Sequence, residues 1–270
     1  MTTSLLPLTS RHIDLWLAFY GEAADPALAA RLMALLSEAE RAQQSRFHFA
    51  DDRLRYLVTR ALVRSVLSRY AALAPADWGF SANAHGRPAI ANGHPDVHGL
   101  DFNLSHTRGL IALAVSRHRT LGVDVENVAV REVSPGIADH FFAPAEVAAL
   151  AAVPPAQWQH RFFEYWTFKE AYIKARGMGL SIPLEQFSFD FPDARGVRLA
   201  VDPALGDDAG RWWFRQCRPV PDCLLALCAQ RGQGEAPLVT VRRALPGVEE
   251  RVIGVDWVRE SGGEAAGGQG

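Results

Sequence analysis

Two periodicities of hydrophobic and polar positions run along the chain, and they predict both helices and strands. Residues 51–70 repeat apolar side chains at helical spacing with arginines around them; the apolar set is Leu54, Leu57, Leu62 and Val66. Residues 160–176 carry a second pattern of this kind. Residues 111–115 and 121–128 are apolar or alternate with β-branched residues, as buried strands do. The chain is therefore expected to mix helices with strands.

Three pairs of segments repeat in the same order at a near-constant offset. The helix start "LLSEAERAQQSRF" near residue 40 matches "FFAPAEVAALAAV" near residue 146. "DWGFSANAHGRP" matches "QFSFDFPDARG", and "LIALAVS" at residue 110 matches "LLALCAQ" at residue 224. A repeat on this scale predicts an α+β fold of two similar lobes packed as a pseudo-dimer, with a cleft between them. The alternative is that helix starts and apolar strands resemble one another by chance.

The repeat also predicts the domain boundaries. We assign residues 1–117 to an N-terminal lobe, residues 118–232 to a C-terminal lobe and residues 233–270 to a C-terminal extension. The extension contains a pattern typical of a short strand pair. Its last part, "SGGEAAGGQG", has too few apolar side chains to fold, so we expect disorder from about residue 260.

Composition narrows the function classes. The 270 residues are 49% hydrophobic, which suits one large core or two packed halves. The net charge of −2, with both signs interspersed, provides no broad basic face and disfavours a protein that grips nucleic acid. No apolar run is long enough to cross a membrane and the start lacks a signal-peptide layout, so we expect a cytoplasmic protein. Cys217, Cys223 and Cys228 lack metal-ligand spacing and are expected to be core thiols.

Lysine is rare in this chain, and both lysines lie in one predicted helix. Of the 28 lysine and arginine residues only Lys169 and Lys174 are lysines, five positions apart in "WTFKEAYIK". The i, i+4 spacing aligns Trp166, Glu170 and Lys174 on one helical face, with Lys169 next to it. The alternative is an ordinary Glu–Lys surface pair, worth only a few tenths of a kcal/mol. The absence of lysine elsewhere weakens that alternative.

A pair of carboxylates lies in the predicted strand "GVDVEN". The strand period of two places Asp124 and Glu126 on one face, about 7 Å apart at Cα, while Val123 and Val125 face a core. Two carboxylates side by side repel each other, and a bound cation would relieve the repulsion. The alternative is a strand with a solvated polar face.

Two further segments have polar side chains suited to binding. In "DFNLSHTRG", Ser105 and His106 lie between an extended segment and a strand, where a hydroxyl, an imidazole and turn amides would bind an anion together. A purely structural histidine is the alternative. In "HGRPAI", the residues Gly86, Arg87 and Pro88 are typical of a turn.

Together these segments resemble the Sfp-type 4′-phosphopantetheinyl transferases. The motifs "GRP", "FNLSH", "GVDVE" and "WTFKEAYIKARGMGL" have the order and spacing of that family, and the resemblance runs from about residue 38 to residue 230. It implies a two-lobed pseudo-dimeric fold. It also implies transfer of the 4′-phosphopantetheine arm of coenzyme A to a serine of an apo acyl or peptidyl carrier protein, with release of adenosine 3′,5′-bisphosphate. Such phosphoryl transfer depends mainly on positioning and charge neutralisation.

The resemblance implies a role for each matching residue. Asp124 and Glu126 match the family's metal-binding carboxylates, and Glu170 matches a third that also serves as general base. The implied metal is Mg²⁺, or Mn²⁺ in its place. Lys174 matches the lysine that contacts the phosphates, and with Glu170, Asp124 and His106 it forms the predicted catalytic set. The predicted coenzyme A contacts are Arg46, Arg55, Arg87, Pro88, Ser105, His106, Lys169 and Lys174. Lys169 is ambiguous, because its alternative role is to orient the helix or the cofactor.

The sequence departs from the family's pattern before the first long helix. Relatives often place lysines there, whereas "AERAQQSRFHF" offers Arg41 and Arg46, with Arg55 inside the helix. Arginine binds phosphate bidentately, so a site for the 3′-phosphate can survive the exchange. The first half has no counterpart of the D-x-E pair, so we expect one active site.

Two rival functions would use overlapping residues. A metal-dependent hydrolase of pyrophosphates or phosphodiesters would use the carboxylates with a positioned water, and a non-catalytic module would only bind carrier proteins. The intact acidic triplet argues against the second. We expect a monomer that serves secondary metabolite biosynthesis. The sequence leaves open which carriers are modified, whether acyl-coenzyme A is accepted, which metal is used and what the C-terminal extension does.

Overall fold

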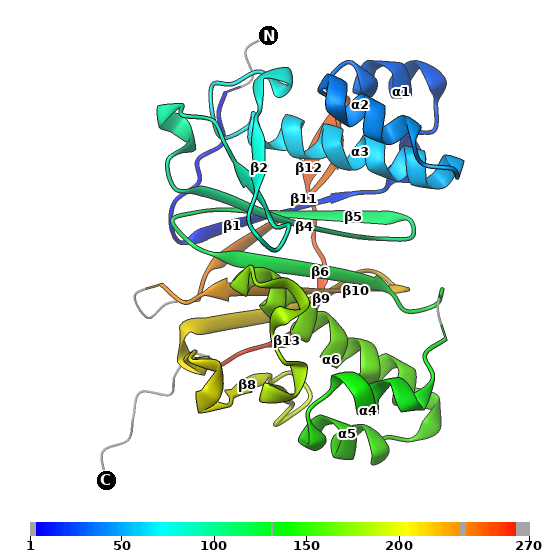
Figure 1. Ribbon diagram of the computed structural model, residues 1–270, viewed down its shortest axis with the longest axis vertical. Helices are drawn as coiled ribbons and strands as arrows, with labels where there is room; N and C mark the ends of the chain where they lie inside the picture. Colours follow the sequence, from blue (N-terminus) through cyan, green and yellow to red (C-terminus); the bar gives the residue numbers. More distant parts are fainter. Residues whose placement is uncertain (1–3, 131, 233–235, 263–270) are drawn as a thin grey trace. The chain divides into compact units, whose positions relative to one another are not determined.

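The computed structural model describes residues 4–130, 132–232 and 236–262 and has an α+β fold (Figure 1). The chain divides into two compact units. Unit 1 comprises Met1–Asn83, Pro88–His118 and Leu238–Gly254, and unit 2 comprises Ala84–Arg87, Arg119–Pro237 and Val255–Gly270. The predicted α+β fold class is confirmed.

The elements of each unit follow one another in chain order. Unit 1 contains β1 (His12–Ala18), α1 (Pro26–Met33), α2 (Glu38–Ser45), α3 (Ala50–Leu67), β2 (Phe80–Ala82), β3 (Pro88–Ile90), β4 (Leu100–Thr107), β5 (Leu110–Arg117), β11 (Leu238–Leu245) and β12 (Glu249–Val252). Unit 2 contains β6 (Leu121–Asn127), α4 (Ala138–Phe141), α5 (Pro144–Ala151), α6 (Pro155–Arg176), β7 (Phe187–Asp190), β8 (Arg198–Val201), β9 (Trp212–Val220), β10 (Cys223–Gln230) and β13 (Asp256–Glu260). Short 3₁₀ helices are η1 (Tyr20–Ala23), η2 (Pro75–Asp77), η3 (Pro95–Val97), η4 (Pro135–Ile137), η5 (Gly179–Ser181), η6 (Leu184–Gln186), η7 (Pro203–Leu205) and η8 (Ala209–Arg211).

The two units repeat one order of elements, as the sequence predicts. A strand (β1 or β6) leads into short helices (α1 and α2, or α4 and α5) and then into a long helix (α3 or α6). A small hairpin (β2–β3 or β7–β8) and a larger one (β4–β5 or β9–β10) follow. In one sheet β1 pairs with β5 next to β4, and in the other β6 pairs with β10 next to β9. The repeated segments are therefore matching elements and not chance likenesses.

The long helices begin and end where local chemistry allows. Helix α6 starts at Pro155 and not at the predicted residue 160. Backbone N–H groups in the first turn of a helix have no partner within the helix, so a proline there costs no hydrogen bond. Gly177 ends α6 with a left-handed φ of 66° and donates to the carbonyls of Ile173 and Lys174. In unit 1, α3 ends at Leu67 and not at the predicted residue 70.

The C-terminal segment contributes strands to both sheets. β11 pairs in parallel with β1, with Val241 opposite Leu15, and β11 and β12 form the predicted strand pair. β13 pairs antiparallel with β9 in the sheet of unit 2. The residues that the sequence groups into one extension thus divide between the two units. The predicted disorder from about residue 260 concerns mainly residues 263–270, which lie outside the described residues.

Each unit has an apolar core beneath its long helix. The predicted apolar face of α3 packs into the core of unit 1, with Leu54 at its partly buried edge.

Cys217, Cys223 and Cys228 are free and buried, as predicted, and burial raises the pKa of each thiol. In the part of the chain that the structure describes, no helix combines the length and apolar character needed to cross a membrane.

Helix α6 packs directly on strand β6 at Gly122. A Cβ atom placed on Gly122 would overlap the carbonyl oxygen of Ala171 and lie 2.5 Å from the backbone nitrogen of Ala175. Backbone therefore meets backbone at this point, which a larger residue does not permit. The glycine of "GVDVE" sets the distance between the strand that carries Asp124 and the helix that carries Lys174.

Replacing Gly122 with alanine should destabilise unit 2. The added methyl group forces α6 away from β6, and overpacking of a core site costs roughly 1–3 kcal/mol. Urea unfolding followed by circular dichroism measures the loss. Gly136→Ala is the matched control, because a Cβ atom there meets nothing within 4 Å. Equal unfolding midpoints for the two variants would contradict this account of the packing.

Candidate active site

Strand β6 directs Asp124 and Glu126 to the face that α6 covers. Both follow Gly122 at steps of two residues, so their side chains lie on the side of its contact with the helix. Val123 and Val125 are buried on the other side. Asp124 is only 4% exposed, which excludes the solvated polar face for this residue.

Helix α6 brings Glu170 and Lys174 to the same place. Lys174 Nζ donates to Asp124 Oδ1 at 2.7 Å, with the lysine side chain 27% exposed and the aspartate side chain 5% exposed. This ion pair joins α6 to β6. It differs from the ordinary surface pair of Glu170 and Lys174 along the helix, which was the alternative to a functional role for Lys174. The predicted catalytic residues of unit 2 are thus gathered at one point.

Burial and like charge raise the pKa of two carboxyl groups in this site. Burial, and then the charge of Asp124, raise the pKa of Glu126 to about 7; Lys174 and a hydrogen bond from Trp166 oppose the rise. Burial, and then the charge of Asp124, also raise the pKa of Glu170, while Lys174 lowers it. A carboxyl group with a raised pKa suits proton transfer near neutral pH.

The predicted metal ligands are close together but are not arranged around an ion. Among the described residues, no three His, Cys, Asp or Glu side chains converge in a way that could hold a metal. The chemistry of the donor set does suit a hard divalent cation, because Asp124, Glu126 and Glu170 offer only carboxylate oxygens. The charge of Asp124 also raises the pKa of both glutamates, and a cation would relieve this repulsion. The metal site stays a prediction.

Lys169 belongs to the core of unit 2. Its side chain is 1% exposed, and its ammonium group lies 2.8 Å from Glu146 Oε2, Leu184 O and Phe187 O. These acceptors match the three ammonium hydrogens, which leaves none for a ligand. The assignment of Lys169 to coenzyme A binding is corrected accordingly, and orientation of the helix is the role that its contacts support.

Glu146, the partner of this lysine, was not singled out from the sequence. Its buried carboxylate also accepts from the backbone N–H of Phe189 at 2.8 Å and of Ala143 at 2.9 Å. Burial raises its pKa, and the lysine and these N–H groups oppose the rise. The repeat contained a signal for it: Glu40 occupies the matching place at the start of α2 and contacts Arg64 of α3 at 2.8 Å.

Arg87 lies at the C-terminal end of α6. Its guanidinium group donates to the carbonyl oxygen of Lys174 and, at 3.1 Å, to that of Ala175. Carbonyl groups at a helix C-terminus carry partial negative charge, so Arg87 stabilises the turn that presents Lys174. Pro88 begins strand β3, opposite Ala82.

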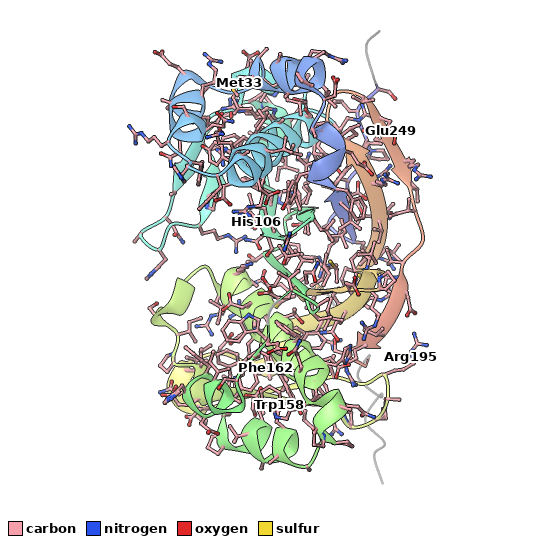
Figure 2. All side chains as sticks on the ribbon, turned by 90° about the vertical axis from the view of Figure 1, so that its right-hand side faces the viewer. Met33, His106, Trp158, Phe162, Arg195 and Glu249 are labelled. Carbon is pink, nitrogen blue, oxygen red and sulfur yellow. The ribbon has the colours of Figure 1, made fainter. Side chains whose placement is uncertain are left out.

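Ser105 and His106 lie within strand β4, which corrects their expected place near turn amides. They pair with Ala112 and Ile111 of β5, and the chain turns further on, at Gly109, with a φ of 89°. Ser105 is buried, and His106, which Figure 2 labels, is exposed.

Two of the three arginines predicted to bind coenzyme A, Arg46 and Arg55, lie in unit 1. Arg46 follows α2 at its C-cap and is exposed. Arg55 contacts Asp52 at 2.6 Å and Asp51 at 3.9 Å. A phosphate at Arg55 would therefore compete with these carboxylates.

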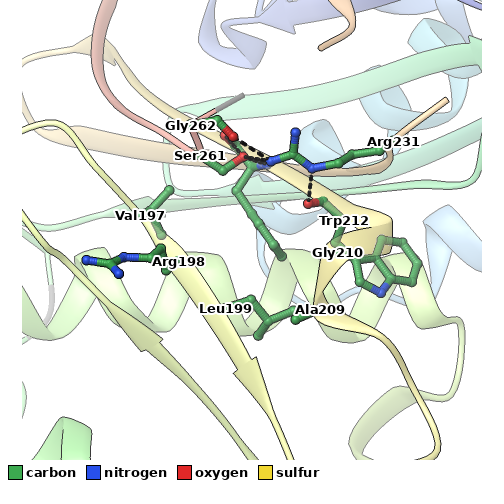
Figure 3. A pocket seen from close by; sticks show the side chains of 10 residues that line it. Val197, Arg198, Leu199, Ala209, Gly210, Trp212, Arg231, Ser261 and Gly262 are labelled. Carbon is green, nitrogen blue, oxygen red and sulfur yellow. Dashed lines mark hydrogen bonds between the residues drawn. The ribbon is translucent and has the colours of Figure 1, made fainter. Parts of the chain in front are cut away.

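A pocket of about 230 Å³ opens beside Glu126. Apolar and aromatic side chains form the rest of its lining: Val133, Ile137, Phe141, Phe162, Phe163 and Trp166. Another pocket of unit 2, of about 210 Å³, lies where Arg231 donates to Trp212 O at 3.0 Å and to Gly262 O at 2.8 Å (Figure 3). Of these two pockets, the first adjoins the acidic residues.

Several known proteins are similar to this chain. The profile of the 4′-phosphopantetheinyl transferase superfamily matches residues 120–228, and that of the 4′-phosphopantetheinyl transferase N-terminal region matches residues 25–118. The chain is 34% identical to 4′-phosphopantetheinyl transferase HetI of Nostoc sp. over 76% of this chain and 83% of that protein. It is 37% identical to the transferase ffp of Bacillus subtilis (74% and 85% covered) and 35% identical to the transferase Sfp of Bacillus subtilis strain 168 (74% and 84%).

Replacing Glu126 with glutamine should change how stability depends on pH in the metal-free protein. Folding raises the pKa of Glu126 from 4.5 to about 7, so the folded state favours the protonated carboxyl group. The contribution of protonated Glu126 to the free energy of unfolding is complete below pH 4.5 and is lost as the pH rises through 7. Glu126→Gln should therefore be more stable than the wild type at about pH 8, by roughly 1–3 kcal/mol, and the difference should vanish near pH 4.5.

Urea unfolding in EDTA at both pH values measures this difference. Glu249→Gln is the control, because Glu249 is exposed on β12 and its substitution should leave the pH dependence unchanged. A stability difference for Glu126→Gln that stays constant across this pH range would contradict the raised pKa.

Arginine at the two lysine positions should have unequal effects on stability. Lys169→Arg places a wider planar group among three acceptors in a closed site and should lower the free energy of unfolding by roughly 1–3 kcal/mol. Lys174→Arg keeps a cation beside Asp124 at a partly exposed position, so its loss should stay under about 1 kcal/mol. Thermal melting compares the two variants. The account fails if Lys174→Arg is the less stable one.

Proposed function

The chain belongs to the 4′-phosphopantetheinyl transferase superfamily, and on this premise we propose that it loads carrier proteins. The serine hydroxyl of an apo carrier protein attacks the phosphorus atom that bears the pantetheine arm of coenzyme A. A Ser Oγ–P bond forms, a P–O bond of the pyrophosphate breaks, and adenosine 3′,5′-bisphosphate leaves with the electron pair. The observation that carries the proposal is the contact of Lys174 with Asp124 beside two carboxyl groups of raised pKa, Glu126 and Glu170.

Glu170 is the proposed general base. Burial and the charge of Asp124 raise its pKa, so its carboxylate accepts a proton more readily than an exposed glutamate does. It lies one helical turn before Lys174, which places base and cation on one face of α6. The serine proton moves to the Glu170 carboxylate as the serine oxygen attacks.

Lys174 is the proposed contact for the phosphates of coenzyme A. Its ammonium group has three donors and is partly exposed, so it can bind a phosphate oxygen while it still contacts Asp124. A fixed cation at this point stabilises the negative charge that develops on the leaving group. Arg87 supports this role indirectly, because it binds the carbonyl groups of the turn that presents Lys174.

Mg²⁺ is the proposed metal, with Mn²⁺ as a substitute. Asp124, Glu126 and Glu170 would hold it, and when bound it would neutralise charge on the pyrophosphate of coenzyme A. The support is the donor set itself: its oxygens are carboxylate oxygens only, and burial, followed by the charge of Asp124, raises the pKa of both glutamates.

The other proposed coenzyme A contacts belong to unit 1. His106 and Arg46 are exposed and therefore accessible to an anion. Arg55 would exchange its contact with Asp52 for the 3′-phosphate. Pro88 and the buried Ser105 would contribute only through the few atoms that a ligand can reach.

The proposed substrates are acyl, peptidyl or aryl carrier domains of fatty acid, polyketide or nonribosomal peptide synthases. Two similar units in one polypeptide support a monomer. A net charge of −2 with interspersed signs supports a protein partner over nucleic acid. A cytoplasmic location and a role in secondary metabolism complete the proposal.

Incubation with coenzyme A, Mg²⁺ and an apo carrier protein should increase the mass of the carrier by about 340 Da, the mass of one phosphopantetheinyl group. Intact-protein mass spectrometry measures the gain. Asp124→Ala should abolish most transfer, because it removes the partner of Lys174 and a proposed metal ligand. The far-ultraviolet circular dichroism of this variant should stay that of the wild type. Asp190→Ala is the matched control, since Asp190 is exposed on β7, and it should transfer at the wild-type rate.

Lys174→Arg should lower the transfer rate about tenfold, or by about 1.4 kcal/mol of transition-state stabilisation, because a planar guanidinium group directs its donors differently. Wild-type rates in both Lys174→Arg and Asp124→Ala would remove this cluster from the active site. Consumption of coenzyme A with an unmodified carrier would show a hydrolase in place of a transferase.

A further inference from the structure

Asp207 is a buried carboxylate that binds the last turns of α6. It lies between η7 and η8, and its side chain is 1% exposed. Its Oδ2 atom accepts from Tyr172 Oη at 2.6 Å and from Arg176 Nη1 at 2.8 Å, both on α6. The same oxygen accepts from Trp212 Nε1, at the start of β9, at 2.8 Å. One carboxylate oxygen therefore joins the helix to the sheet of unit 2.

The surrounding donors keep this carboxylate charged. Its other oxygen, Oδ1, accepts from the backbone N–H of Asp208 at 2.9 Å and from Arg211 Nη1 at 3.3 Å. Burial acts to raise the pKa of Asp207, but hydrogen bonds from Tyr172 and Trp212 help to outweigh it, and the pKa lies below its usual range. Hydrogen bonds to an ionised acceptor are stronger than those to a neutral one. Asp207 therefore binds α6 firmly at neutral pH.

The two helix residues that Asp207 binds lie on either side of Lys174 in the chain. Tyr172 precedes the lysine by two positions and Arg176 follows it by two, so both lie on the opposite face of the helix. Arg176 Nη1 also donates to Tyr172 Oη at 2.8 Å, which links the two side chains. On its own face, Lys174 Nζ reaches Asp124 of β6 at 2.7 Å. The last turn of α6 is therefore bound on both sides.

Lys174 lies in the part of α6 that most needs such support. The helix ends at Arg176, and the last four carbonyl groups of a helix lack partners within it, so helix ends fray. A shift of this turn would move the ammonium group relative to a bound phosphate. A displacement of about 1 Å can cost on the order of 10²-fold in rate. The placement of Lys174 therefore depends on what fixes the turn.

We propose that Asp207 is a positioning residue: it fixes the last turn of α6 and so sets where the ammonium group of Lys174 meets the phosphates of coenzyme A. This inference rests on the proposed function, in which Lys174 contacts those phosphates. A carboxylate that only stabilised the fold would affect melting and leave the surroundings of Lys174 unchanged in the folded protein. The two roles are therefore separable by experiment.

Glu164→Gln is the matched control for Asp207→Asn. Glu164 is also a buried carboxylate that binds α6 to its surroundings, since it contacts Arg161 at 2.7 Å and Arg259 of β13 at 3.2 Å. Both substitutions turn a buried carboxylate into an amide of the same size. Glu164 lies ten residues before Lys174, or about 15 Å along the helix axis. Both variants should melt below the wild type, but only Asp207→Asn disturbs the turn that carries the lysine.

Transfer kinetics at a temperature where every variant is folded separate the two roles. The kcat should fall about tenfold in Asp207→Asn with a nearly unchanged KM for coenzyme A, and should stay within about twofold of the wild type in Glu164→Gln. Tyr172→Phe removes one donor to Asp207 and keeps the ring, so its kcat should fall about threefold. This milder variant tests the same contact if Asp207→Asn does not fold.

The two lysines also allow a test without any reaction. Lys169 and Lys174 are the only lysines in the chain, so ¹³C-labelled lysine gives two sets of ε-methylene signals in a ¹H–¹³C spectrum. Lys174→Arg removes one set and thereby identifies it. The Lys174 signals should move in Asp207→Asn and Tyr172→Phe, and should stay in place in Glu164→Gln.

The outcomes distinguish this inference from the proposed function. If the folded Asp207 and Tyr172 variants keep the wild-type kcat or the wild-type Lys174 signals, Asp207 serves stability alone and the inference fails, while the transferase is unaffected. An equal loss of kcat in Glu164→Gln would also overturn the inference, because the loss would then follow stability. If the wild type transfers no phosphopantetheine, the proposed function fails and the inference fails with it.

Discussion

Backbone contact between helix α6 and Gly122 of strand β6 is the constraint on which the active site depends. Because a Cβ atom at Gly122 would overlap the helix backbone, helix and strand approach this closely only with glycine at the contact. Side chains on the facing surfaces then meet, and Lys174 reaches Asp124 at 2.7 Å. The same approach buries carboxyl groups, and burial is the first cause of the raised pKa of Glu126 and Glu170. The geometry and the electrostatics of the site both follow from one missing side chain.

The two lysines of α6 are used in different ways. Lys169 of α6 binds oxygen atoms from α5, η6 and β7 in a closed site, so one compact ammonium group links these four elements. Unit 1 fills the matching place with arginine, since Arg60 and Arg64 of α3 both contact Glu40. The forked guanidinium groups converge on a single carboxylate there, whereas three separate acceptors suit the three separable donors of lysine. Lys174 has no such enclosure, and its partial exposure is what a ligand contact requires.

Local periodicity explains which parts of the structure could be predicted from the sequence. The period of two places Asp124 and Glu126 on one face, and the helical period places Glu170 beside Lys174. The acceptors of Lys169 could not be predicted, because a helical pattern shows which face a side chain occupies and not which distant oxygens meet it. The turn expected around Ser105 was wrong because β4 continues through polar residues while β5 pairs with it. The parallel pairing of β11 with β1 is a long-range choice that alternation alone does not encode.

In helix α6, the residues that stabilise the fold and the residues of the proposed active site lie on different faces. One face presents Glu170 to Asp124 and Glu126 of β6, and the repulsion among these carboxyl groups works against the metal-free fold. Another face anchors the helix through neutralised buried charge: besides Lys169, Tyr172 and Arg176 bind the carboxylate of Asp207 at 2.6 and 2.8 Å. The anchoring positions recur at steps of three and four residues, so they stay on one side of the helix while Glu170 and Lys174 occupy the other. A strongly held helix can therefore present an electrostatically unfavourable acidic cluster, which a cation and an anionic substrate would together neutralise.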